Sequence, residues 1–127
     1  MAINTTGYLP ILPIAPTKVI TASGATASTN WIDLGVSGKY YVSVAIKVED
    51  LGGTNPTHSF VVQCADNSSG ENAVDLIPAT PANGNKACYL FNCLIDDAKQ
   101  FVKITVTLGG TSPTISYSYD IRAYRLA

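Results

Sequence analysis

Four stretches of the chain alternate apolar and polar residues with a period of two. Such alternation is typical of β-strands with one buried and one solvated face. No stretch combines the helical period with an N-cap and sufficient length. The pattern therefore predicts an all-β domain with a core built from one parity of each stretch. The residues of that parity are Val42, Val44, Ile46, Val48, His58, Phe60, Val62, Cys64, Val102, Ile104, Val106, Leu108, Ile115, Tyr117, Tyr119 and Ile121.

A Leu-Gly-Gly-Thr-x-Pro-Thr motif joins these stretches in pairs, at Leu51–Thr57 and again at Leu108–Thr114. Glycine accepts positive φ and proline ends ladder pairing, so the motif predicts turns. We expect two long antiparallel hairpins, 39–49 with 57–65 and 100–108 with 114–126, one for each face of a sandwich. The loop tips would carry Thr54, Asn55, Thr111 and Ser112.

Four shorter apolar runs, at 18–21, 30–35, 73–77 and 87–95, bring the expected total to about eight strands. That number and the paired hairpins predict a jelly-roll-like antiparallel β-sandwich. Residues 87–95 are apolar on both sides: Tyr89 and Phe91 on one face, Leu90 and Leu94 on the other. This strand is therefore either central and buried, or covered by another subunit.

Residues 1–16 precede the sandwich, which we assign to 17–127, and contain Pro10, Pro13 and Pro16. Prolines at this spacing forbid a helix and oppose a central strand, which leaves an extended arm. The arm either folds over an edge of its own sheet or lies on a neighbouring subunit, because an exposed apolar arm is a liability on a free monomer. Its apolar residues are Tyr8, Leu9, Ile11, Leu12 and Ile14.

Charged residues make up only 13% of the 127 residues, and the net charge is −1. This composition offers no electrostatic field for nucleic acid. The longest apolar stretch, 8–16, is interrupted by proline and too short to span a membrane. The N-terminus has no secretion signal, and the three cysteines form no zinc pattern. We expect a protein made in a reducing cytoplasm, with Cys64 buried as a free thiol.

The inventory of chemical groups is thin for an enzyme. His58 is the single histidine and shares the apolar parity with Phe60, which favours a structural role. Asp96 and Asp97 are adjacent and do not form a facing carboxylate pair. The polar run 66–72 lacks the spaced carboxylates of a calcium loop. The sequence therefore predicts no catalytic residue, no metal site and no cofactor.

One segment, Ala27–Gly35, resembles a Ser-Thr-Asn-x-Ile-Asp-Leu-Gly stretch of the small jelly-roll cement (decoration) proteins of tailed-phage capsids. As in that family, a Gly-Gly-Thr element then precedes a strand that ends near an Asp-Asn pair, here Asp66 and Asn67. The resemblance covers about residues 26–72, and the proline-rich arm departs from the family's more polar lead-in.

The resemblance implies a structural virion protein without enzymatic activity. It would sit on the outer surface of an icosahedral head as a homodimer or homotrimer, bridging subunits of the major capsid protein. The arm residues would contact the shell, and the loop tips would contact the shell or another subunit. The alternative is a carbohydrate- or receptor-binding module such as a fibre tip, with Trp31 and Tyr40, and also Tyr41, Tyr117 and Tyr119, as candidate stacking faces. A head–tail connector or tail component is a further structural role.

Overall fold

The computed structural model describes residues 8–10, 15–24, 26–35, 40–95 and 99–126, and these residues contain strands and no helix. The described residues accordingly include no helix with the length and apolarity needed to cross a bilayer. The strands are β1 (Tyr8–Pro10), β2 (Ala15–Ser23), β3 (Thr26–Ser28), β4 (Ile32–Asp33), β5 (Tyr40–Ala65), β6 (Val74–Ile77), β7 (Cys88–Ile95) and β8 (Phe101–Leu126).

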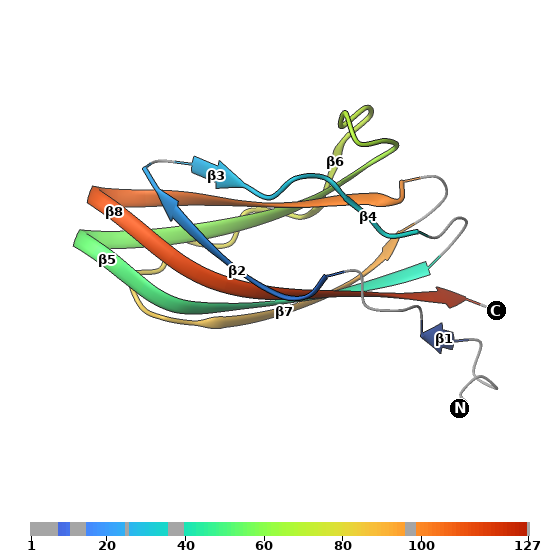
Figure 1. The fold of residues 1–127 in the computed structure, drawn as a ribbon, viewed down its shortest axis with the longest axis horizontal. Helices are drawn as coiled ribbons and strands as arrows, with labels where there is room; N and C mark the ends of the chain where they lie inside the picture. Colours follow the sequence, from blue (N-terminus) through green and yellow to red (C-terminus); the bar gives the residue numbers. More distant parts are fainter. Residues whose placement is uncertain (1–7, 11–14, 25, 36–39, 96–98, 127) are drawn as a thin grey trace.

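Two very long strands, β5 and β8, organise the molecule. They pair antiparallel along their whole lengths, from Tyr40 opposite Arg125 to Ala65 opposite Phe101. In Figure 1 this two-stranded ribbon runs to the left end of the molecule, bends, and returns above itself. Each long strand therefore contributes one half to each layer of a sandwich.

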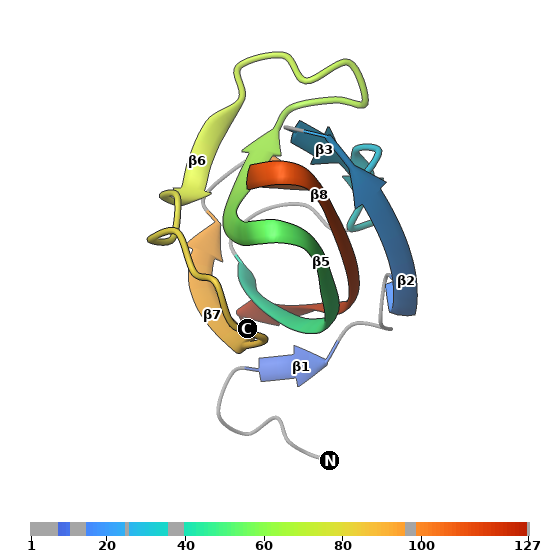
Figure 2. The ribbon, with the colours of Figure 1, turned by 90° about the vertical axis from the view of Figure 1, so that its left-hand side faces the viewer.

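The shorter strands extend the two layers. The layer that we call the β7 sheet contains β7, the first half of β5, the second half of β8, and then β2 and β1. The layer that we call the β6 sheet contains β6, the second half of β5, the first half of β8, and then β3 and β4. Figure 2 shows the bent ribbon in the centre, with β6 and β7 on one flank and β2 and β3 on the other.

The predicted hairpins are wrong. Within the described part of the chain, the stretches 40–49 and 57–65 lie in opposite layers and do not pair with each other, and the same holds for 100–108 and 114–126. Instead, the two copies of the repeated motif pair with one another, with Thr54 opposite Thr111. Each long strand does reverse its direction at its copy of the motif, as the glycines and proline predict, but it reverses as half of a ribbon and without a tight turn.

The alternation of apolar and polar residues is confirmed. Every apolar position predicted from it is buried, together with Leu34 and Ala123. Phe60 and Tyr117, one from each long strand, pack edge to face with ring centroids 5.1 Å apart in the core. Burial of alternate side chains on two facing sheets is what stabilises a sandwich of this kind. The all-β, jelly-roll-like fold of about eight strands is thus confirmed.

Two local assignments differ from expectation. β3 lies within the small-residue segment 22–29, which carried no strand signal; its backbone pairs with β8 from Thr26 to Ser28. β7 is not central: among the described residues it pairs with β5 alone, and Leu90 and Leu94 on its outer face are exposed. Of the two explanations for its apolar faces, burial inside the chain is therefore wrong for the outer face. Coverage by another subunit stays a prediction.

Candidate contact surfaces

The end of the molecule where the ribbon bends, which we call the corner, consists of residues 51–57 and 108–114. Gly53 and Gly110 both have positive φ, at 106° and 102°. A Cβ atom on Gly53 would lie 2.7 Å from the backbone oxygen of Ser112, and one on Gly110 would lie 2.5 Å from that of Asn55. The close approach of two backbones at positive φ requires glycine at both places.

The residue before each of these two glycines also makes a reciprocal close contact with the other copy of the motif. Gly52 is paired with Thr114, and a Cβ atom on it would lie 2.6 Å from Thr114 Oγ1. The equivalent distance from Gly109 to Thr57 Oγ1 is 2.5 Å. The two copies of the motif are therefore related by a local twofold axis that passes near the pair Thr54–Thr111. The repeated sequence thus corresponds to a repeated local geometry.

All four residues predicted at loop tips lie together on the corner. Thr54, Asn55, Thr111 and Ser112 are exposed, and Asn55 and Ser112 have positive φ of 50° and 49°. None of the four is charged, and their backbone belongs to the paired ribbon of β5 and β8. The corner is thus a neutral surface of exposed hydroxyl and amide groups.

The described part of the arm, β1, lies at the opposite end from the corner. In β1, Tyr8 pairs with Leu126 and Leu9 with Arg125, so this part of the arm joins the β7 sheet of its own chain. Ile11, Leu12 and Ile14 lie outside the described residues. Figure 1 shows β1 and the end of β8 on the right and the corner on the left. Of the predicted arm residues, the structure therefore places Tyr8 and Leu9 away from the corner.

The candidate aromatic residues are scattered. Trp31 is half-buried on the β6 sheet: Lys103 Nζ lies 4.7 Å from its ring centroid, and Gly70 packs against its indole. Tyr40 belongs to the β7 sheet, and its side chain is not among those described. Tyr117 and Tyr119 are buried, and burial raises the pKa of Tyr117 to about 12. Among the described side chains, Trp31, Tyr117 and Tyr119 thus do not form one platform.

His58 is fully buried in the core, as its parity predicted. Its Nε2 lies 2.9 Å from Tyr89 Oη, and Asn83 Nδ2 donates to the same phenol oxygen at 3.4 Å. His58 Nδ1 has no hydrogen-bond partner within the described residues. Burial lowers the pKa of His58, because the charged imidazolium loses its hydration. The group acts in packing and in joining β5 to β7.

The polar loop 66–72 uses its acceptors internally. Asn67 Oδ1 accepts from the backbone N–H groups of Ser69 and Glu71, and Lys99 Nζ donates to Asp66 Oδ1 at 3.1 Å. Hydrogen bonds from Asn72 and Lys99 hold the pKa of Asp66 below its usual value. The described residues include no group of three or more His, Cys, Asp or Glu side chains that could hold a metal ion.

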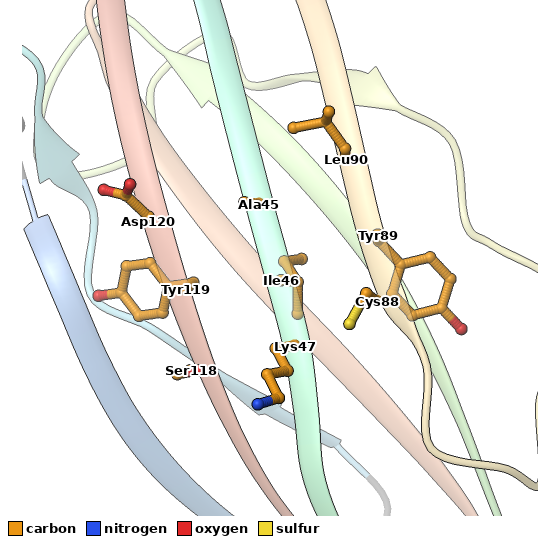
Figure 3. Close-up of a pocket in the computed structure, with 9 residues that line it drawn as sticks. All are labelled: Ala45, Ile46, Lys47, Cys88, Tyr89, Leu90, Ser118, Tyr119 and Asp120. Carbon is orange, nitrogen blue, oxygen red and sulfur yellow. The ribbon is translucent and has the colours of Figure 1, made fainter.

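Sequence reasoning missed one surface feature, a shallow hollow of about 360 Å³ on the outer face of the β7 sheet. Figure 3 shows it over Ala45, with Leu90 and Cys88 from β7 on one side and Asp120 from β8 on the other. The floor of the hollow is low because Ala45 on the central strand is smaller than its cross-strand neighbours Leu90 and Asp120. The sequence signal is a pair of small residues, Ser43 and Ala45, on the outward parity of the strand.

No protein-family model matches the sequence, and no curated protein matches it. Solved structures match the fold. One is a cyanophage Pam1 capsid chain, with a TM-score of 0.52 and 13% identity over 98% of this chain and 91% of that chain. Another is the infectious bursal disease virus VP2 subviral particle, with a TM-score of 0.57 and 13% identity over 94% of this chain and 32% of that chain.

A third match is a bacterial domain, the K3 adhesin domain of Lys-gingipain from Porphyromonas gingivalis W83. Its TM-score is 0.54 and its identity 9%, over 84% of this chain and 73% of that chain. The chain spans about a third of the VP2 chain and most of the other two. At these identities the likeness concerns the fold, which viral capsid proteins and an adhesin domain share.

Proposed function

We propose that this protein is a capsid cement (decoration) protein of a tailed phage. It would bind the outer surface of an icosahedral head and stabilise the contacts between subunits of the major capsid protein. The observation that carries the proposal is that β1, the described part of the arm, and the corner lie at opposite ends of the sandwich. A body with a contact surface at each end can bridge two neighbours, which a single site cannot do.

The chemistry of the corner supports such a role. Its exposed residues offer hydroxyl and amide groups without charge, on a backbone held by paired glycines. A surface whose backbone is already paired in a ladder has less conformational entropy to lose when it binds. Each contact can be of ordinary size, about 800 Å² per partner, because many contacts on a symmetric lattice add avidity. With few charges to screen, binding would depend only weakly on salt.

The arm supplies the second surface in this proposal. Residues 11–14 contribute Ile11, Leu12 and Ile14, which would bury apolar surface against the shell, while β1 anchors the arm to its own sheet. The protein would act as a homodimer or homotrimer, made in the host cytoplasm and carried on the virion. Preferential binding to the expanded shell would stabilise that state by linkage.

The test uses DNA-filled heads that lack the protein. Added wild-type protein should raise the temperature at which the heads release DNA by several degrees, measured with a DNA-binding dye. The Thr111→Arg variant, which places a bulky charge on the neutral corner, should lose most of this shift. Ser68→Arg, at an exposed loop position away from the corner, should keep it. An unchanged release temperature with wild-type protein would sink the proposal.

Deletion of residues 1–14 tests the contribution of the arm to head binding separately from that of the corner. It removes β1 and leaves β2 whole, so the sandwich should still fold, and binding to heads should weaken at least tenfold. Circular dichroism and thermal unfolding check the fold, and co-sedimentation with heads measures binding. If the shortened chain binds as well as the full chain, the arm has no part in attachment.

A further inference from the structure

The open edge of the β7 sheet has a defined hydrogen-bond pattern. Lys47 lies opposite Cys88, and Val48 N donates to Ala87 O at 2.9 Å, which makes Lys47–Cys88 a pair without mutual hydrogen bonds. In an antiparallel ladder the two kinds of pair alternate. The backbone groups of Leu90, Asn92 and Leu94 therefore point away from β5, toward the open edge.

The four edges of the sandwich differ in how they are protected. β2 carries Pro16 and Lys18, β6 has only 4 residues and is followed by Pro78, and β3 and β4 have 3 and 2 residues. Proline, lysine and short length are the usual means of preventing edge-to-edge pairing. β7 has 8 residues with neither a proline nor a charged residue. It is the edge most open to another strand.

The outward side chains of β7 are self-complementary. Leu90 is 67% exposed and Leu94 47% exposed, and Asn92 lies midway between them on the same face. An antiparallel copy centred on Asn92 would bring each leucine beside a leucine and the amide beside an amide. The absence of charge on β7 means that no like charges would meet.

We propose that β7 pairs edge to edge with β7 of a second copy, antiparallel about Asn92, which joins the two β7 sheets into one continuous sheet. The backbone groups of Leu90, Asn92 and Leu94 would make the new ladder, with Leu90 beside the partner's Leu94. The axis is twofold, so the contact closes at two copies and leaves no β7 edge free. This dimer continues the apolar outer face across the seam and brings the exposed leucines of the two copies side by side.

The inference deepens the self-association in the proposed function and rests on it, but its readout is solution mass. The prediction of head binding and the prediction of a dimeric solution mass can therefore be contradicted independently. A contact of one strand pair is smaller than an ordinary interface of about 800 Å² per partner, so we expect a dimer in the micromolar range. The measurement must therefore follow mass over concentration.

The first experiment is sedimentation equilibrium of the full chain from 1 to 200 µM, a range set by the expected dissociation constant of about 1–100 µM. Wild type should reach twice the 13.4 kDa of one chain. Leu90→Lys with Leu94→Lys should stay at the single-chain mass with an unchanged circular dichroism spectrum, because both side chains are exposed. Val74→Lys, another exposed apolar position but on the β6 sheet, should still form the dimer. A wild-type monomer, a trimer, or a dimer that survives the double substitution would each overturn the proposal.

The second experiment tests the register. In a Cys88→Ser background, Asn92→Cys should form an intermolecular disulfide under mild oxidation, because paired Cα atoms about 5.5 Å apart permit one. Ser43→Cys is the matched control: it lies in the same row but one strand inward, roughly 14 Å from its copy, and should not cross-link. Cross-linking at Ser43 but not at Asn92, or equal cross-linking at both, would overturn the register.

Discussion

The two copies of the corner motif have the same backbone and different surroundings. Gly53 and Gly110 take nearly equal positive φ, and each approaches a backbone oxygen of the other copy. Yet Pro113 is buried, with its carbonyl accepting from Gly24 N at 3.3 Å, whereas Pro56 is half-buried. The bend is a property of the motif, while its burial is a property of the segments that cover it.

The residue after each copy shows the same contrast. Ile115 follows the second copy and packs in the apolar core, whereas His58 follows the first and needs the hydroxyl of Tyr89. Tyr89 belongs to β7, and Asn83, which also binds its oxygen, belongs to the segment before it. A polar residue is tolerated at this core position because the covering segment supplies a partner.

The largest effect should come from the glycines of the corner. Gly53→Ala or Gly110→Ala should lower the free energy of unfolding by about 2–4 kcal/mol, through positive φ and through overlap with a backbone oxygen. Chemical denaturation measures the loss. If the local twofold axis is real, the two variants should agree within about 1 kcal/mol.

Two other glycines separate the cost of positive φ from the cost of overlap with a neighbouring atom. Gly24 has φ of 105° but no atom within 4 Å of an added Cβ, so Gly24→Ala should cost only the strain, about 1–2 kcal/mol. Gly84→Ala, with ordinary φ and its nearest contact at 3.4 Å, should be nearly neutral. Equal losses at Gly24 and Gly53 would show that the close approach does not matter.

The second-largest effect should be a pH dependence of stability that arises from His58, the residue after the first copy of the motif. Because burial lowers the pKa of His58, the unfolded chain takes up a proton near the ordinary value of 6.5 and the folded chain does not. Stability should therefore fall as pH drops below about 6.5 until the folded pKa is reached, by at most about 1.4 kcal/mol per pH unit for one proton. Unfolding followed from pH 8 to pH 5, in about half-unit steps across the ordinary histidine pKa, measures this slope.

His58→Ile places in the first copy the residue that the second copy has, and it should remove this component of the slope. The variant leaves Tyr89 Oη with Asn83 as its neighbour, so some stability at neutral pH should be lost, about 1 kcal/mol. A slope in the variant equal to that of wild type would assign the pH dependence to other groups.

The smallest effect should be the difference in stability lost when each of the two prolines is replaced by alanine. Pro113→Ala should cost about 1–2 kcal/mol, because it frees the unfolded chain and removes buried ring atoms. Pro56→Ala should cost about 0.5 kcal/mol, chiefly through the unfolded chain. Thermal unfolding of both variants compares them directly, and a larger loss at Pro56 would contradict the role of burial.

Much of the fold follows from local pattern. The parity of Val42 to Val48 and of Val102 to Leu108 predicted the buried face residue by residue, because a strand exposes alternate side chains to opposite sides. The exposure of Thr54 and Thr111 followed from the turn chemistry around them. The pairing of the strands did not follow, because alternation is the same whichever strand lies alongside.

The sequence by itself determined which residues are buried, where each long strand bends, and that the two bends are alike. Only the tertiary structure decided that the bends belong to one ribbon, that β1 and the corner lie at opposite ends, and that β7 is an open edge. The physical reason is that side-chain periodicity and glycine conformation are local properties. The choice of pairing partner depends on contacts between residues far apart in the chain, which only the packed sandwich establishes.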